Sequence, residues 1–155
     1  MNEGNTIAKG LEDNSCKPKR GALKQLLSDD EKSQADIYAL SYDFACRIIR
    51  LFQFLTEDSS YKEYIISKQV YRSGTSIGAN VSEAHNAQSK ADFVTKMTIA
   101  SKEANETTYW LNLLHDNGYL DDRQFSSLNN DTQRILCKLV AIVKTTRQNM
   151  EKRKN

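Results

Sequence analysis

The stretch QVYRSGTSIGANVSEAH, residues 69–85, combines two glycines with small polar residues, yet it places Ile77 and Val81 one helical turn apart. Glycine in the interior of a helix costs about 1 kcal/mol relative to alanine, so Gly74 and Gly78 need a compensating role. Their spacing puts both on one side of a helix, where the lack of side chains lets another backbone approach closely. The stretch therefore predicts a helix that packs tightly against a neighbour.

A phosphate-binding glycine loop is the alternative interpretation of the same residues. Such loops follow a β-strand and carry a GxGxxG or GK[ST] pattern. No strand pattern precedes Gly74, and neither motif follows it. The residues favour a contact between helices.

A polar stripe runs along the same predicted helix, which extends from about residue 61 to 84. Its members lie beside the small residues, so we expect them to face other helices and to be paired there, because buried polar groups need partners. Arg72 is expected to form a buried ion pair with Glu103 or Glu106 of the next helix, or with Glu83 of its own. A structural network is one interpretation of the stripe, and a ligand-contacting surface is the other. The stripe consists of Arg72, Ser76, Asn80 and Glu83.

The length and composition indicate one helical domain. The 155 residues are enough for a single core, and the 27% of charged residues suit long amphipathic helices. Pro18 is the single proline, so nothing from residue 19 to 155 blocks a helix interior. Residues 1–27 lack sustained periodicity, and we expect a flexible N-terminal tail there, followed by the folded domain over residues 28–155.

The first predicted helix carries an unusually wide apolar surface. Two apolar stripes run side by side along it, and at about 100° per residue they cover roughly 240° of the circumference. One bundle cannot cover so wide an arc, so we expect a second subunit to cover the remainder. The stripes are Ile37, Leu40, Phe44, Ile48, Leu51 and Leu55, and beside them Tyr38, Tyr42, Ala45, Ile49 and Phe52.

Two further helices complete the pattern. Ser89 and Asp92 have the spacing of a capping box at the start of the third helix, and the Asn-Gly pair at 117–118 ends it. Asp121, with Gln124 three residues later, starts the fourth. Four amphipathic helices with short connections and no strand pattern predict an all-α fold, an antiparallel up-down four-helix bundle.

Patterns that indicate catalysis or metal binding are absent from the sequence. Neither His85 nor His115 has the glutamate three residues before it that a di-iron bundle requires, and the 3 cysteines are widely separated. We therefore expect no enzyme activity, no metal and no cofactor. The longest aliphatic run, LVAIV at 139–143, is too short to cross a bilayer, and no secretory signal is present, so we expect a cytoplasmic protein that does not associate with membranes.

Positive charge gathers at the C-terminal end. From residue 132 onward there are seven basic residues and one acidic residue, whereas the rest of the chain has an excess of acids. The asymmetry indicates a polyanion or an acidic partner; a solvated helix face that complements the helix dipole is the alternative. If the protein binds nucleic acid, the expected phosphate contacts come from Arg134, Lys138, Lys144, Arg147, Lys152, Arg153 and Lys154.

Three motifs resemble one known family. RSGTSIGANVSEA at 72–84, AQSKADF at 87–93 and IASKEANETTYWLNLL at 99–114 are similar to the four-helix bundle proteins encoded by intervening sequences in 23S ribosomal RNA genes. The likeness extends from about residue 41 to 144. Where many relatives read Ala-Glu-Gly, this chain has SEA at 82–84. The lack of this glycine bears on how sharply the chain turns after the second helix, and it does not change the expected fold.

The resemblance implies a homopentameric ring with no established enzymatic activity. A related member, the accessory protein of diversity-generating retroelements, works with a reverse transcriptase and nucleic acid. The expected partners are therefore further copies of the chain, RNA or DNA, and a reverse transcriptase or a ribosomal component. Two hypotheses of function follow: an accessory ring that binds nucleic acid or a ribonucleoprotein, and a protein-binding scaffold whose cations only keep it in solution.

Overall fold

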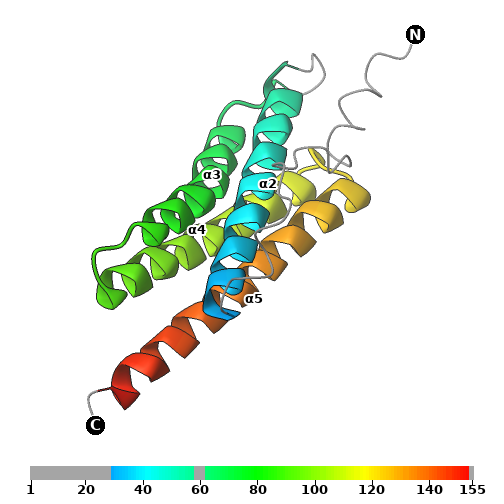
Figure 1. Cartoon of the computed structure of the whole chain (residues 1–155). Coiled ribbons are helices and arrows are strands. Elements are labelled where there is room, and N and C mark those ends of the chain that lie inside the picture. Colours follow the sequence, from blue (N-terminus) through cyan, green and yellow to red (C-terminus); the bar gives the residue numbers. More distant parts are fainter. Residues whose placement is uncertain (1–28, 58–61, 154–155) are drawn as a thin grey trace.

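The computed structural model describes residues 29–57 and 62–153. Every regular element in these two segments is an α-helix, and consecutive helices run in opposite directions with short connections (Figure 1). The fold is the predicted all-α, up-down four-helix bundle. The expected tail, residues 1–27, lies outside the described residues. None of the described helices is both long and apolar enough to cross a membrane. The helices are α2 (Asp29–Glu57), α3 (Ile66–His85), α4 (Lys90–Asp116) and α5 (Asp122–Lys152).

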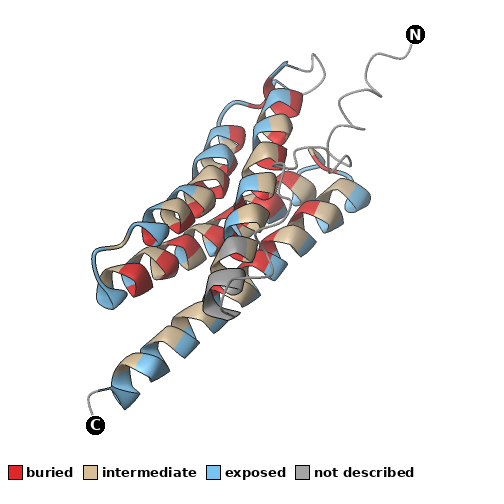
Figure 2. Cartoon of the chain, in the orientation of Figure 1, coloured by how far each residue is buried: buried red, intermediate tan, exposed pale blue. Residues whose placement is uncertain are grey.

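The core lies where the four helices face one another (Figure 2). The first apolar stripe of α2 is at its centre, with Ile48 and Leu51 fully buried. The second stripe stays partly open, since Tyr38, Tyr42 and Ile49 are 37%, 47% and 39% exposed. The single chain therefore leaves uncovered a part of the wide apolar arc of α2.

Gly74 and Gly78 lie where α3 crosses α2, and they permit the predicted close contact. A Cβ atom at Gly74 would lie 2.7 Å from Cγ1 of Ile48. A Cβ atom at Gly78 would lie 3.4 Å from the backbone oxygen of Ser41. A side chain at Gly74 would force α2 and α3 apart, which explains this glycine, whereas the space at Gly78 admits a Cβ atom at an ordinary contact distance.

The predicted caps of α4 and α5 are present. Ser89 accepts a hydrogen bond of 3.1 Å from the backbone N–H of Asp92 at the start of α4. Gly118, in the left-handed conformation at φ 78°, ends that helix. Asp121 and Gln124 form a complete capping box at the start of α5. These caps satisfy backbone groups that a helix leaves unpaired at its ends.

The start of α3 differs from the prediction, because the helix begins at Ile66 and not near residue 61. The carboxylate of Glu63 explains the difference. It accepts hydrogen bonds from the backbone N–H groups of Ile65, Ile66 and Ser67 at 2.8, 2.8 and 2.6 Å. These backbone N–H groups lack acceptors within the helix. Glu63 therefore caps α3, although it lies two residues before the N-cap residue, Ile65.

The Glu63 cap predicts a dependence of stability on pH. Burial raises the pKa of Glu63, but the backbone hydrogen bonds outweigh burial and hold the pKa below the ordinary value of 4.5. Because the folded pKa is depressed, the stabilisation is complete above the unfolded pKa and is lost as the pH falls through the folded pKa. We expect Glu63→Ala to lower the free energy of unfolding by about 2 kcal/mol at neutral pH.

Urea unfolding at neutral pH and at about pH 3 measures both parts of this prediction. The difference in unfolding free energy between the parent and Glu63→Ala should shrink on acidification, because protonation removes the same interaction from the parent. A difference that is equal at the two pH values would contradict the cap.

Candidate nucleic-acid interface

The C-terminal end of α5 projects beyond the rest of the bundle (Figure 1). Leu139 is the last buried residue of this helix, and the described residues after it are exposed or half-buried (Figure 2). Ile142 and Met150 still pack against the core on one side. The projecting end therefore keeps one side on the bundle and presents the rest of its surface to solvent.

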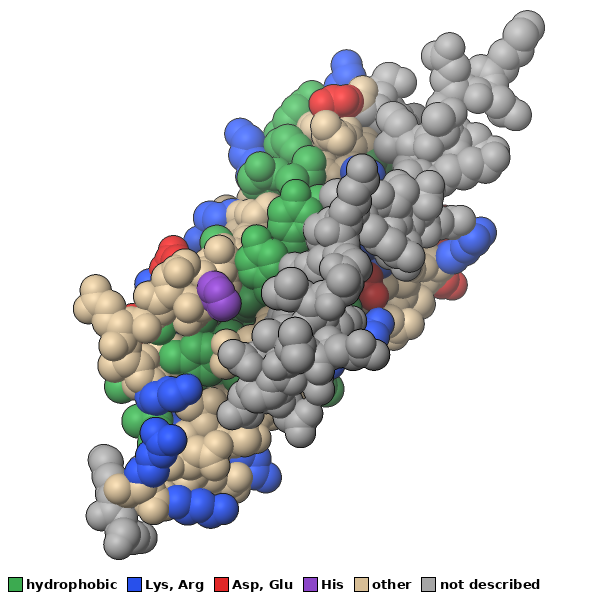
Figure 3. Space-filling view, viewed as in Figure 1, with side chains coloured by type: hydrophobic (Ala, Val, Ile, Leu, Met, Phe, Trp, Pro, Cys, Tyr) green, Lys and Arg blue, Asp and Glu red, His purple; other side chains and the backbone are tan. Residues whose placement is uncertain are grey.

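Most of the predicted phosphate-binding cations lie on this projecting end, where Figure 3 shows Lys and Arg side chains gathered. Arg134 and Lys138 lie apart from them, because Arg134 precedes Lys144 by about 15 Å along the helix axis. Arg134 is exposed, Lys138 is half-buried, and Lys154 lies outside the described residues. We call the exposed set the cationic end: Lys144, Arg147, Lys152 and Arg153.

A further cation comes from α4. Lys90, its first residue, and Arg153 line the same hollow of about 200 Å³, whose walls also include Ile142 and Met150. The sequence did not predict Lys90, because it is distant along the chain from the other cations. The antiparallel topology was the available signal, since it places the start of α4 beside the end of α5.

Basic residues dominate the charge of this end. In the described part of α5 that follows Asp131, Glu151 is the one acidic residue. A group of cations with few neighbouring acids produces a positive potential that attracts polyanions. Among the described residues, no cluster of three or more His, Cys, Asp or Glu side chains could hold a metal ion.

The predicted polar stripe of α3 forms interhelical contacts, but at the surface. Nη2 of Arg72 lies 2.6 Å from Oε1 of Glu106, which also accepts the indole N–H of Trp110 at 3.2 Å. The expected pair is therefore present, whereas its expected burial was wrong: the Arg72 side chain is 61% exposed. An exposed pair contributes about 0–1 kcal/mol, far less than a buried one.

The remaining members of the stripe also favour a structural role. Glu83 pairs with Lys96 of α4 at 2.5 Å, and the side-chain amide of Asn80 donates to the backbone oxygen of Ser76 at 2.9 Å. These contacts tie α3 to α4 or stay within α3.

Glu103 differs from the other members of the network. It is half-buried, and one of its carboxylate oxygens is shielded from solvent without a hydrogen-bond partner. Burial raises the pKa of Glu103, the neighbouring Glu106 raises it further, and Arg72 opposes both effects. The structure thus places Glu103 beside the Arg72–Glu106 pair without a direct bond to it.

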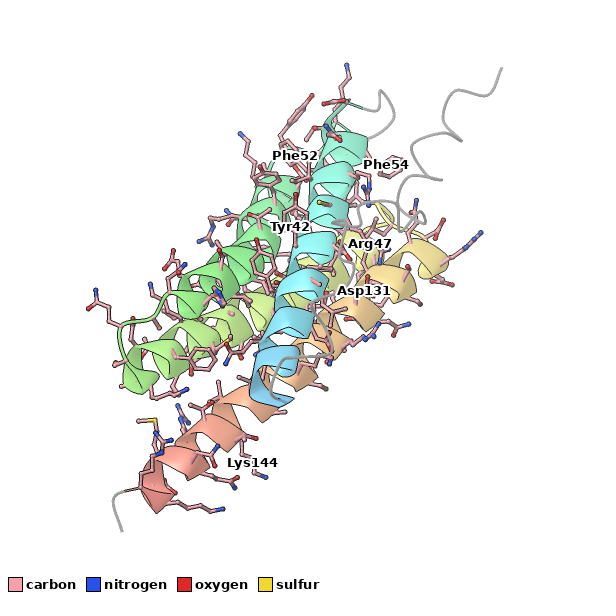
Figure 4. The ribbon with its side chains drawn as sticks, in the orientation of Figure 1. Tyr42, Arg47, Phe52, Phe54, Asp131 and Lys144 are labelled. Carbon is pink, nitrogen blue, oxygen red and sulfur yellow. The ribbon has the colours of Figure 1, made fainter. Side chains whose placement is uncertain are left out.

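A partly buried ion pair that the sequence did not predict joins α2 to α5. The guanidinium of Arg47 donates to the carboxylate of Asp131, and it also donates to the hydroxyl of Ser127 at 2.8 Å. The side chains of Arg47 and Asp131 are 10% and 38% exposed, and they meet between the two helices (Figure 4). The available signal was the place of Arg47 directly before Ile48, at the edge of the buried stripe, where a charge needs a partner.

His115 makes a polar contact between α4 and α5. Its Nε2 lies 2.8 Å from Oδ1 of Asp122, and its ring stacks on Phe125 with 4.4 Å between centroids. The hydrogen bond to Asp122 raises the pKa of His115. Both partners lie in the first turn of α5, so His115 links the end of α4 to the start of α5 and has no part in the cationic end.

Comparisons with known proteins agree with the fold. A model of the 23S rRNA-intervening sequence protein family matches residues 33–141. The chain is also similar to a solved structure, a protein of unknown function from the S23 ribosomal protein family of Bacteroides thetaiotaomicron. The two are 48% identical with a TM-score of 0.70, over 72% of this chain and 98% of the other. No curated protein matches the chain. The family match ends before Lys144, so the cationic end lies beyond it.

Proposed function

Because this chain belongs to the 23S rRNA-intervening sequence protein family, we propose that it is a non-enzymatic, homo-oligomeric accessory protein that binds RNA or DNA within a ribonucleoprotein. The observation that carries the proposal is the cationic end of α5. Its four cations are exposed on a helix that projects from the bundle, and Lys90 of α4 lines the same hollow as one of them, Arg153. A ribosomal component or a reverse transcriptase is the kind of protein partner that the resemblance implies.

The cationic end suits the phosphate backbone better than the bases. Lysine and arginine side chains on one helix contact phosphates, and such contacts position a protein on nucleic acid without reading its sequence. In the described residues of α5 after Phe125 there is no aromatic side chain on which a base could stack. Binding is therefore expected to depend strongly on salt and weakly on sequence.

The oligomeric part of the proposal rests on α2. Tyr38, Tyr42 and Ile49 remain exposed in the single chain, and soluble monomers rarely expose large contiguous apolar surfaces. The family resemblance makes a pentameric ring the specific form. A ring repeats the cationic end in every subunit, so contacts that are weak singly give a high combined affinity.

Neutralising the cationic end is expected to weaken binding to all nucleic acids alike. We expect the triple variant Lys144→Gln, Arg147→Gln and Lys152→Gln to lose affinity for both a duplex DNA and a structured RNA. Its plot of log affinity against log salt should be shallower by about 2 to 3, since each lost phosphate contact removes roughly 0.9 from the slope. Fluorescence anisotropy over a range of salt concentrations measures both quantities.

A matched control removes the same charge elsewhere. Lys62, Lys68 and Lys102 are exposed on other parts of the bundle, and their replacement by glutamine should leave the salt slope close to that of the parent. An equal effect of both triple variants would show that net charge, and not the cationic end, governs binding. The parent should bind at about 50 mM salt, where electrostatic binding is strong.

A protein-binding scaffold is the second candidate function. The exposed tyrosines of α2 favour it, because tyrosine is enriched at protein interfaces. If the parent protein retards no RNA or DNA at about 50 mM salt, the scaffold replaces the nucleic-acid proposal.

A further inference from the structure

The hollow that Lys90 and Arg153 line lies where three helices meet. α2 contributes Gln34 to its wall, α4 contributes Lys90, and α5 contributes residues between Ala141 and Arg153. Figure 1 shows the start of α2, the start of α4 and the end of α5 at the same end of the bundle. The volume of the hollow, about 200 Å³, exceeds the roughly 150 Å³ of a cavity that holds a benzene ring. The hollow therefore has room for one small ring-shaped group.

Two cations line this hollow without a counter-charge. Within the part of the chain that the structure describes, no ion pair joins Lys90 or Arg153 to an acid. The ammonium group of Lys90 lies 5.9 Å from the centre of the Phe93 ring, so its contact there is with a ring and not with a carboxylate. Two like charges beside one small space favour an anion. Phosphate is an anion that lysine and arginine bind through charge-assisted hydrogen bonds.

The rest of the wall combines neutral polar groups with apolar side chains. Gln34 and Asn149 contribute carboxamides, each of which offers a donor and an acceptor. The hydroxyl of Thr146 donates to the backbone oxygen of Ile142 at 2.8 Å, and its own oxygen can still accept a hydrogen bond. Ile142 and Met150 supply apolar surface. A small inorganic anion would use the cations and leave the carboxamides and the apolar surface without a partner.

A nucleotide matches all three kinds of lining group. Its phosphate suits the two cations, and the polar edge of its base suits the carboxamides, since asparagine and glutamine are common partners of base edges. The flat face of the base can lie against Ile142 and Met150, so it is held by aliphatic contact and not by stacking on an aromatic ring. Because a carboxamide presents either a donor or an acceptor, the hollow is not restricted to one base.

We propose that the hollow holds one unpaired nucleotide of a strand that is bound at the cationic end. This inference rests on the proposed function and specifies the form of nucleic acid that the site takes. Lys152 directly precedes Arg153, so the cation at the hollow continues into the rest of the cationic end. A base within a duplex is paired and stacked, and its extrusion costs a few kcal/mol. The hollow therefore distinguishes an unpaired nucleotide from a duplex, whereas the other cations contact the phosphates of both.

The test fills the hollow without changing any charge. Ala141 and Thr145 line it, are exposed and lie one helical turn apart, so the double variant Ala141→Leu and Thr145→Leu should fold and narrow the space for a base. Fluorescence anisotropy compares a short single-stranded DNA, the same strand without bases, and a duplex. The parent should bind the intact strand about tenfold more tightly than the abasic strand, as expected from one good base contact. The filled variant should bind both strands equally and the duplex as the parent does.

The matched control carries the same two substitutions at the same spacing on α4. Ala91 and Thr95 are exposed, and neither lines the hollow. The double variant Ala91→Leu and Thr95→Leu should keep the preference of the parent for the intact strand. Circular dichroism on heating shows whether both double variants are folded.

A free nucleotide has the same chemistry as a nucleotide within a strand, and competition separates the two sources. Adenosine monophosphate should displace the labelled strand only at a concentration far above that of an unlabelled strand, because it lacks the further phosphates that bind along α5. Equal displacement by the two competitors would identify a free nucleotide as the ligand and would overturn the inference.

The remaining outcomes separate the inference from the proposed function. A parent that binds neither strand nor duplex at about 50 mM salt refutes the proposed function, and the inference with it. A parent that binds both but does not prefer the intact strand to the abasic one overturns the inference alone. A filled variant that keeps the preference of the parent has the same consequence.

Discussion

Asp131→Ala should lower the free energy of unfolding by about 3 kcal/mol, because it leaves the buried guanidinium of Arg47 without a counter-charge. The Arg47 side chain is only 10% exposed, so water solvates its guanidinium poorly, although the carboxylate of Asp131 is itself 38% exposed. The expected loss is at the low end of the range for broken buried pairs, because Asp131 is partly exposed and Ser127 still accepts hydrogen bonds from Arg47. Urea unfolding measures the change directly.

Two comparisons separate the loss of the charge partner from a general effect of substitution. The double variant Arg47→Met and Asp131→Ala should be more stable than Asp131→Ala alone, because it leaves no unpaired buried charge. Glu83→Ala breaks a pair at the surface, where the Glu83 side chain is 58% exposed, and should cost about 0–1 kcal/mol. If Asp131→Ala costs no more than Glu83→Ala, the ion pair between Arg47 and Asp131 does not stabilise the fold as described.

Gly74→Leu is expected to cost about 3 kcal/mol or more through overpacking. Even its Cβ atom would lie 2.7 Å from Cγ1 and 3.0 Å from Cγ2 of Ile48. Ile48 is fully buried, and its branched side chain has few alternative rotamers in a helix, so α2 and α3 would have to separate. The denaturant midpoint reports the loss; if the leucine variant does not fold, Gly74→Ala tests the same contact at smaller size.

Gly78→Ala is the matched control on the same side of α3. Its Cβ atom would lie 3.4 Å from the backbone oxygen of Ser41, an ordinary contact distance. Alanine is a better helix former than glycine by about 1 kcal/mol, so this variant should be as stable as the parent or more stable. Equal stability of Gly74→Ala and Gly78→Ala would contradict the close contact with Ile48.

The helices and most of their ends could be predicted from the sequence, because their causes are local. Ser89 and Asp121 are caps whose partners lie within the next few residues, and Gly118 ends α4 through its own backbone conformation. The close approach at Gly74 also followed from local spacing, since only a tight contact offsets glycine in a helix. The width of the apolar arc on α2 also indicated that a single bundle would leave part of it exposed.

The candidate site was predicted only in part. The charge of the C-terminal region marked the cationic end, but one helix carries its cations on several sides, and the sequence could not say which of them would gather. In the tertiary structure, Arg134 and half-buried Lys138 lie apart from the projecting end, whereas Lys90 of α4 lines the same hollow as Arg153. It also put the Arg72 pair at the surface, because the stripe lies along the outer edge of the contact between α3 and α4.

The sequence by itself determined which segments are helical, where α4 and α5 begin, and that α3 approaches a neighbour closely. These properties depend on residues a few positions apart, and the helical period relates such residues directly. The tertiary structure alone decided which distant residues come together: Arg47 pairs with Asp131, and Lys90 lines the same hollow as Arg153. Such meetings depend on how each helix is rotated and shifted against its neighbours, which is set by the packing of the whole core and by no local pattern.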